Sequence, residues 1–144
     1  MNIRKASQED VPIIDEIVKR EFPYTKIPQE RIAQKISEKN FLILVACQAN
    51  IFTGFAETEL LENEARLNGI FVEDAWRDQK IATNIIKKTF EELKKQKIFR
   101  IFLLVKESND GAKKLYEKNG FKFEKIHDKE IEGEKIEIWS QQLN

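Results

Sequence analysis

Two stretches of the chain combine residue types that can bind an anion and donate a proton. In RDQKIATNII, residues 77–86, a helix is predicted to begin directly after a strand-like run. The free N–H groups and the dipole at the start of a helix favour a bound phosphate. Loops of this kind usually contain glycine, whereas the chain has none between Gly69 and Gly111. Residues 77–82 are therefore either a phosphate site without its usual residue or only a turn.

The second stretch is NDGAKKLYEKNGF, residues 109–121, which contains Asn109 and Tyr116. A phenol with a reference pKa of about 10 stays protonated at neutral pH and can donate its proton. Tyr116 can equally be a tyrosine that packs an amphipathic helix against a sheet. The position of its hydroxyl relative to a cleft decides between these two interpretations.

The composition argues against several other classes of function. The 25 basic and 25 acidic residues cancel, so no overall field favours nucleic acid or an anionic membrane as a partner. With one cysteine, Cys47, and one histidine, His127, we expect no intramolecular disulfide, no metal site and no hydrolytic triad. The chain has no signal-like start and no apolar run of membrane-spanning length, and we expect a cytoplasmic protein without a membrane partner.

Hydrophobic spacing predicts the elements that must position these residues. The length of 144 residues suits one domain, spanning 1–144. Strands are predicted at residues 2–6, 41–48, 51–60, 66–72, 99–105, 121–126 and 135–143, and helices from 8 to about 22, up to 40, within 77–96 and within 109–120. The order β-α-α-β-β-β-α-β-α-β-β predicts an α/β domain with a mixed central sheet and helices on both faces.

Particular residues predict how some of these elements begin, pack and end. Ser7 and Asp10 form a variant of the capping box before the first helix. Gly120 is well placed to end the helix that contains Tyr116. The run FRIFLLV, residues 99–105, is continuously apolar, which is typical of a strand buried on both faces. If this strand and the one at 66–72 are parallel neighbours, a ligand can enter where their C-terminal ends diverge.

These residues resemble the GNAT-type N-acetyltransferase superfamily. The family's pyrophosphate loop, Arg/Gln-x-x-Gly-x-Gly/Ala, is matched in RDQKIA at Arg77 and Ala82. The second signature, Asn-x-x-Ala-x-x-Leu-Tyr-x-x-x-Gly-Phe, matches throughout, at Asn109, Ala112, Leu115, Tyr116, Gly120 and Phe121. The stretch VKESNDGAKKLYEKNGF is most similar to the ribosomal-protein alanine N-acetyltransferase branch. The resemblance in element order covers essentially the whole chain.

The resemblance implies acetyl transfer from acetyl-CoA to a primary amine, by direct attack in a ternary complex. The backbone around Phe71 and Val72 would pair with the pantetheine arm, and Asn109 would contact the cofactor near its thiol end. Tyr116 would protonate the departing thiolate. The pyrophosphate would be held by the amides of Arg77, Asp78, Gln79, Lys80, Ile81, Ala82 and Thr83.

The chain departs from the family pattern at the glycine of the loop and at the general base. Lys80 occupies the glycine position, where a lysine in an α-like conformation can still supply its N–H and its ammonium can sit against a phosphate. Leu104 stands where the ribosomal branch has a glutamate, and Asn68 where other branches have an acid. Glu57 and Glu59 remain, and Glu57, nearer the middle of its strand, is the predicted base, although each can be an ordinary surface glutamate.

The linker EFPYTKIP is similar to the segment that borders the peptide groove in protein-acetylating relatives. Phe22 and Tyr24 are therefore predicted to wall the site of the amine, which is a protein N-terminus or a small amine, unless they only cap the core. We expect a monomer or a homodimer. The alternative function is a non-catalytic acyl-CoA-binding or sensing domain, favoured by Lys80 and Leu104. A small interaction module without a cofactor would leave Asn109 and Tyr116 as coincidences.

Overall fold

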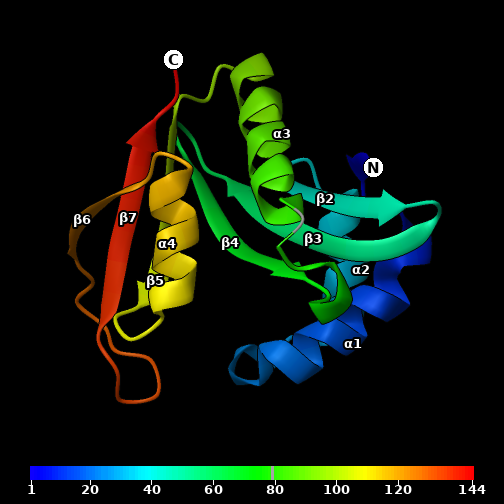
Figure 1. Ribbon diagram of the computed structural model, residues 1–144, viewed down its shortest axis with the longest axis horizontal. Helices are drawn as coiled ribbons and strands as arrows, with labels where there is room; N and C mark the ends of the chain where they lie inside the picture. The colour runs from blue at the N-terminus through cyan, green and yellow to red at the C-terminus, as the bar shows by residue number, and fades with distance from the viewer. Residues whose placement is uncertain (79) are drawn as a thin grey trace.

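Seven strands form one mixed sheet in the order β1-β2-β3-β4-β5-β7-β6 (Figure 1). The computed structural model describes residues 1–78 and 80–144. The strands are β1 (Asn2–Lys5), β2 (Phe41–Gln48), β3 (Ile51–Leu60), β4 (Ala65–Val72), β5 (Arg100–Lys106), β6 (Lys122–Ile126) and β7 (Ile136–Gln142). The helices are α1 (Val11–Glu21), α2 (Gln29–Ser37), α3 (Ile81–Lys95) and α4 (Asp110–Lys118), with short 3-10 turns η1 (Gln8–Asp10), η2 (Pro23–Thr25) and η3 (Asp74–Trp76). The predicted α/β fold and element order are confirmed.

Helices cover both faces of the sheet, as the apolar stripes predict. Ile14 and Ile17 of α1 and Ile32 of α2 pack on one face in a single cluster of buried side chains. On the other face, α3 contributes Ile85 and Leu93 to a larger cluster that also includes side chains of β2, β4, β5 and α4. The sheet is therefore held between two separate apolar layers, one for each face.

The start of α1 is fixed by the predicted capping residues. The backbone N–H of Ser7 donates to the Asp10 carboxylate over 2.8 Å. Arg4 of β1 donates to both oxygens of the same carboxylate, over 2.7 and 3.0 Å. These bonds hold the pKa of Asp10 below its usual range, chiefly because the carboxylate is bonded to the Arg4 guanidinium. Asp10 thus joins the edge strand to the helix that follows it.

The β2–β3 hairpin turns through Ala49 and Asn50, which have φ of 49° and 69°. Positive φ at both central residues is typical of the tight turn that matches strand twist. Gly120 has φ of 93° and follows the end of α4, where its N–H bonds to the Glu117 carbonyl. Both turns lie where the sequence predicts them.

The prediction that the strand at 99–105 is buried on both faces is wrong for one face. Ile101, Leu103 and Val105 of β5 are buried, whereas Phe102 and Leu104 between them are only half-buried. The reason is that the apolar layer of α1 and α2 packs on β2, β3 and β4. The second face of β5 is thus left partly uncovered.

The parallel pairing of β4 with β5 is short, and the two strands then separate. Their paired residues run only from Ala65 with Ile101 to Leu67 with Leu103. On its other side, β4 continues along β3, but the register shifts so that Asn68 has no partner between Leu67 and Gly69. Asn68 is thus a β-bulge, which bends a strand and re-aims its side chains. In Figure 1, β4 and β5 lie together at the top and diverge toward the bottom.

No helix among the residues that the structure describes is long and apolar enough to cross a membrane.

Candidate active site

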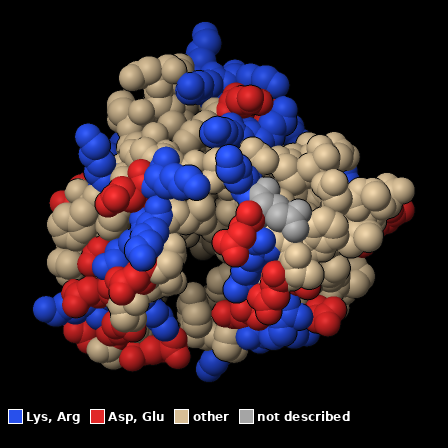
Figure 2. Space-filling model, in the orientation of Figure 1, with Lys and Arg blue, Asp and Glu red and all other residues tan. Residues whose placement is uncertain are grey.

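The divergence of β4 and β5 opens a cleft of about 910 Å³. Its walls are residues 68–72 of β4, 104–106 of β5, 76–78 and 80–83 around the start of α3, six residues from 109 to 118 of α4 and its cap, and Glu21, Phe22 and Tyr24. Figure 2 shows a hollow on this face, bordered by side chains of both charges. Among the predicted site residues that the structure describes, all line this cleft except Glu57. Gln79 lies outside the described residues.

The edge of β4 that faces the cleft is open beyond Leu67. The N–H of Glu73 donates to the Thr53 carbonyl over 2.8 Å, so residue 73 is bonded toward β3. In an antiparallel ladder this direction alternates, so Phe71 is also bonded toward β3, whereas Ile70 and Val72 direct their N–H and C=O groups to the open edge. A linear ligand can therefore pair with Ile70 and with the Val72 N–H as an added strand would, whereas the Val72 carbonyl already accepts from Arg77.

This alternation changes the role that Phe71 can have. The backbone groups of Phe71 are engaged with β3, and its side chain is buried among those that pack against α1 and α2. Ile70, which sequence reasoning did not select, has the backbone direction that was expected of Phe71. The signal that would have found it is the strand parity, which depends on knowing that Asn68 is bulged.

The loop before α3 keeps the backbone shape of a glycine loop without glycine. Lys80 has φ of 61° and ψ of 19°, and Asp78 has φ of 66°. Lys80 is thus in the left-handed region, which glycine adopts more readily than other residues. The helix begins immediately afterwards, with the N–H of Asn84 bonded to the Lys80 carbonyl over 3.0 Å. Ile81, Ala82 and Thr83 lie in the first turn of α3, so their N–H groups have no carbonyl partner within the helix. These residues border the cleft.

The Arg77 side chain fastens this loop to the end of β4. Its Nε donates to the Val72 carbonyl over 3.0 Å, and its Nη1 lies 3.1 Å from the Asp74 carboxylate. The guanidinium carbon also lies 5.8 Å from the centre of the Phe71 ring. Arg77 therefore positions the loop through its side chain, and its own backbone N–H is bonded to the Asp74 carbonyl over 3.3 Å.

Tyr116 is buried at the wall of the cleft, with an exposed fraction of 8%. Burial, which disfavours the charged phenolate, raises the pKa of Tyr116 to about 12, with a smaller contribution from Tyr24. Its ring packs edge-on against Phe121, with ring centres 5.7 Å apart. The phenol is therefore protonated, held by packing and adjacent to the space where a ligand can lie.

Asn109 joins β5 to α4 as the N-cap of the helix. Its side-chain oxygen accepts a hydrogen bond from the Ala112 N–H over 3.1 Å. Because the oxygen is used in this way, the amide nitrogen is the group that remains for a ligand in the cleft, which Asn109 also lines.

The predicted base, Glu57, lies behind the cleft wall. Its carboxylate is 3.1 Å from the Lys35 ammonium and accepts a hydrogen bond from the Asn68 side chain over 2.7 Å. Among the described residues that line the cleft, the carboxylates are Glu21 and Asp78. The role of Glu57 as a base stays a prediction without support from this geometry, and Glu21 is a carboxylate that sequence reasoning missed.

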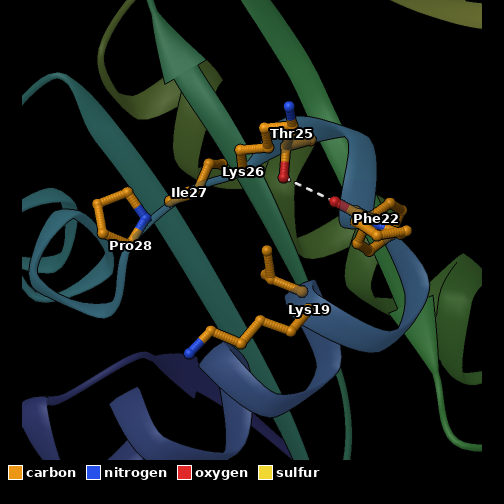
Figure 3. A pocket seen from close by; sticks show the side chains of 8 residues that line it. Lys19, Phe22, Thr25, Lys26, Ile27 and Pro28 are labelled. Atoms are coloured by element: carbon orange, nitrogen blue, oxygen red, sulfur yellow. Dashed lines mark hydrogen bonds between the residues drawn. The ribbon is translucent and has the colours of Figure 1, made fainter.

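The predicted walls of the amine site, Phe22 and Tyr24, both border the cleft. Phe22 also lines a smaller pocket of about 320 Å³ between the end of α1 and the start of α2 (Figure 3). There the Thr25 hydroxyl donates to the Phe22 carbonyl over 2.7 Å and closes the turn. Tyr24 is exposed, and the Lys106 ammonium lies 5.3 Å from its ring centre. The linker thus forms a wall of the cleft that is itself folded and anchored to β5.

Together these features suit transfer of a group from a long anionic ligand. The start of α3 can hold a phosphate, the open edge of β4 can pair with a linear arm, and Tyr116 can donate a proton. The sequence model of the acetyltransferase (GNAT) domain matches residues 3–139.

The chain belongs to the GNAT acetyltransferase family. This confirms the family inferred from the two motifs, and it supports acetyl transfer as the general activity. No match was found among curated proteins.

Solved structures of this GNAT fold match the chain over nearly its whole length. The ribosomal-protein-S18-alanine N-acetyltransferase from Escherichia coli superposes with a TM-score of 0.84 at 24% identity, covering 99% of this chain and 93% of that one. The PaiA N-acetyltransferase from Thermoplasma acidophilum, in complex with coenzyme A, gives a TM-score of 0.81 at 24% identity and covers 98% of each chain. An aminoglycoside 6'-N-acetyltransferase complexed with coenzyme A gives 0.84 at 11% identity, covering 99% and 97%.

Proposed function

We propose that this GNAT protein is an N-acetyltransferase that moves an acetyl group from acetyl-CoA to a primary amine, either a protein N-terminus or a small amine, in a ternary complex. The observation that carries the proposal is the convergence of three groups on one cleft. These are the N–H groups at the start of α3, the open edge of β4 at Ile70 and Val72, and the buried phenol of Tyr116.

The residues present fit acetyl-CoA. The amides of Ile81, Ala82 and Thr83 would hold the pyrophosphate, because the start of α3 directs unpaired N–H groups and the positive end of its dipole there. Lys80 lies at the same end of the cleft and can add its ammonium. The groups of Ile70 and Val72 on the open edge would pair with the amides of the pantetheine arm.

Acetyl-CoA supplies an acetyl group activated as a thioester. In the transfer the amine nitrogen forms a bond to the acetyl carbon, the carbon–sulfur bond breaks, and the sulfur leaves with the bonding electrons. Tyr116 would give the sulfur its proton, and Asn109 would contact the cofactor near this point. The raised pKa of Tyr116 keeps the phenol protonated at neutral pH, so its proton is present when the thiolate forms.

The nitrogen must lose one proton, and two carboxylates are candidates to take it. Glu57 is the base predicted from the sequence, but it does not line the cleft and is bonded to Asn68 and Lys35. Glu21 lines the cleft directly and is paired with Arg20 over 2.9 Å. The Glu57→Gln and Glu21→Gln variants separate them, because removal of the base abolishes the acidic limb of the pH dependence of kcat/KM.

The decisive experiment is a screen of amines with a thiol-release assay. Purified protein is incubated with acetyl-CoA and, in turn, peptides with free N-termini, polyamines and amino acids. We expect release of CoA thiol that depends on one class of amine, together with an acetylated product in the mass spectrum. Thiol release that is the same with and without every amine, despite bound acetyl-CoA, would reject the transferase proposal.

The second candidate is a non-catalytic acyl-CoA-binding or sensing domain. Two observations favour it: Leu104, rather than a carboxylate, lines the cleft on β5, and Lys80 holds a backbone conformation that lysine rarely adopts. A sensor would be stabilised by acetyl-CoA but would show no amine-dependent thiol release. The same screen therefore separates the two functions.

A further inference from the structure

A chain of three side chains connects α2 to the bulge of β4. The Lys35 ammonium lies 3.1 Å from one oxygen of Glu57, and the side-chain nitrogen of Asn68 donates to that same oxygen over 2.7 Å. The side chains of Lys35 and Glu57 are mostly covered, with exposed fractions of 11% and 18%. Lys35 also lies over the Phe41 ring, 5.1 Å from its centre. This is a built contact rather than a chance surface pair.

The contact determines which way the Asn68 amide points. A carboxylate beside an ammonium is charged and can only accept hydrogen bonds. Asn68 must therefore direct its nitrogen to Glu57, and its oxygen is directed away from Glu57. The choice between the two amide orientations follows here from the chemistry of the partner.

Asn68 occupies the point where the cleft begins. It directly follows Leu67, the last residue of β4 that pairs with β5, and it has no partner on β3. It also lines the cleft, next to Ile70 on the open edge. An oxygen held in a fixed orientation at this point can meet the amine that approaches a ligand lying along β4.

We propose that the Asn68 side-chain oxygen accepts an N–H of the amine substrate and thereby aims the nitrogen lone pair at the acetyl carbon. Glu57 is then a positioning residue, which acts through Asn68 and is itself held by Lys35. An amide oxygen accepts a hydrogen bond without taking the proton, so Asn68 orients the amine and leaves deprotonation to another group. The bond strengthens as the attacking nitrogen gains positive charge, so it favours the transition state. This inference rests on the proposed transferase function.

A double-mutant cycle tests whether Glu57 acts through Asn68. Glu57→Gln, Asn68→Ala and the double variant are assayed with acetyl-CoA and two amine probes, an alanine-initiated hexapeptide and spermidine. We expect each single variant to lower kcat/KM for the amine about tenfold, with the KM for acetyl-CoA unchanged, in line with loss of one hydrogen bond to a developing charge. The Glu57 change should have no further effect in the Asn68→Ala background.

Glu38→Gln is a matched control. Glu38, the residue that follows α2, pairs with Arg31 of that helix over 2.8 Å, and Arg31 lies over the same Phe41 ring at 5.4 Å, but neither is bonded to Asn68. Glu38→Gln should leave kcat/KM unchanged. Urea unfolding of all variants shows whether any loss of activity merely follows loss of stability.

A second variant gives a readout that a purely structural role would not move. Asn68→Asp places a carboxylate beside Glu57, and two neighbouring carboxylates raise the pKa of one of them. The pH dependence of kcat/KM should then gain an ionisation that the wild type lacks. An unchanged profile would count against contact of residue 68 with the amine.

Several outcomes would overturn the inference while the proposed function stands. Unchanged amine kinetics in Asn68→Ala would exclude its contact with the amine. An equal loss from Glu57→Gln with and without Asn68 would show that Glu57 acts by another route. If the wild type transfers acetyl to neither probe, calorimetry of the same two amines with the CoA-bound protein replaces kinetics. Absence of amine binding to the CoA-bound protein rejects the inference. Stabilisation of the protein by acetyl-CoA tests cofactor binding independently.

Discussion

Lys80 holds a backbone conformation that glycine adopts more readily. Its φ of 61° lies in the left-handed region. For residues with a Cβ, this backbone conformation costs about 1–2 kcal/mol. The conformation of Lys80 at the start of α3 therefore lowers the free energy of unfolding of the chain. Lys80 also places a cation at the end of the cleft that the start of α3 forms.

We predict that Lys80→Gly stabilises the protein but weakens acetyl-CoA binding. Relief of the left-handed strain, offset by the greater freedom of glycine in the unfolded chain, should raise the free energy of unfolding by about 0.5–1 kcal/mol. Loss of one exposed cation near a phosphate should weaken binding by roughly threefold to fivefold. Urea unfolding and calorimetry measure the two effects.

Lys80→Ala separates the two causes, because it removes the charge but retains Cβ. It should weaken acetyl-CoA binding as much as glycine does and give no stabilisation. Equal binding by all three proteins would mean that the ammonium does not meet the cofactor. The difference in affinity should shrink at high salt, because an exposed ion pair is screened.

Tyr116 is the residue on which the chemical step of the proposal depends most. We predict that Tyr116→Phe lowers kcat at least a hundredfold, which is typical of the loss of a general acid. The phenylalanine keeps the ring packing against Phe121, so acetyl-CoA affinity should change by less than twofold. Steady-state kinetics and calorimetry measure these values, and a kcat within a factor of three of wild type would remove Tyr116 from the mechanism.

At the residue scale, the sequence predicts those groups whose position follows from spacing along one element. Asn109 and Tyr116 lie where the helix period places them, at the cap and on the cleft side of α4. The direction of Ile70 and the partners of Glu57 could not be predicted in this way. Both depend on the bulge at Asn68 and on pairing between strands, which no local pattern shows.

At the element scale, the start of α1 depends on one carboxylate shared by a strand and a helix. We predict that Asp10→Asn lowers the free energy of unfolding by about 1–2 kcal/mol at pH 7, because its bonds to Arg4 and to the Ser7 N–H are made by a charged acceptor. Urea unfolding measures the loss. Glu9→Gln, at the exposed neighbouring residue, should have little effect.

The pH dependence of the same variant gives a second test. The pKa of Asp10 is lowered in the folded protein, so its contribution is present above the unfolded value near 3.8. That contribution is lost as the pH falls through the lower folded pKa. The difference between wild type and Asp10→Asn should therefore be constant near neutrality and disappear in strong acid. A difference that grows on acidification would contradict the bonding pattern.

The limits of most elements could be predicted because their ends carry specific turn residues. β2 and β3 run over the predicted residues, since Ala49 and Asn50 form the tight turn between them. The exposure of β5 could not be predicted from its continuous apolar run. A half-covered strand and a fully covered one have the same composition when the uncovered face borders a cleft.

At the scale of the whole molecule, the same fold is compatible with different amines. Structures described as acting on a ribosomal-protein alanine and on an aminoglycoside both superpose on this chain with TM-scores of 0.84. What these proteins share with this chain is the overall fold. If the proposed transferase function holds, side chains such as Phe22, Tyr24 and Asn68, which border the cleft from separate elements, would select the amine.

We predict that acetyl-CoA raises the stability of the whole chain. A ligand that binds only the folded state at 100 times its Kd adds about 2.7 kcal/mol, which corresponds to several degrees in the Tm of a domain of this length. Thermal unfolding monitored by circular dichroism measures the shift, with adenosine as a control. The absence of a shift at a large excess of acetyl-CoA would contradict both the transferase and the sensing function.

The three-residue junction between β4 and β5 also joins two antiparallel units of the sheet, and we predict that these units open separately. β1 to β4 form one antiparallel unit and β5 to β7 another, joined by pairing from Ala65 to Leu67. Amide hydrogen exchange should therefore show two blocks with different opening free energies. The Ile70 and Val72 amides should exchange fast without ligand and slow markedly with acetyl-CoA, and the two blocks should then open together. The cofactor would in this sense complete the hydrogen-bonded ladder of the protein that binds it.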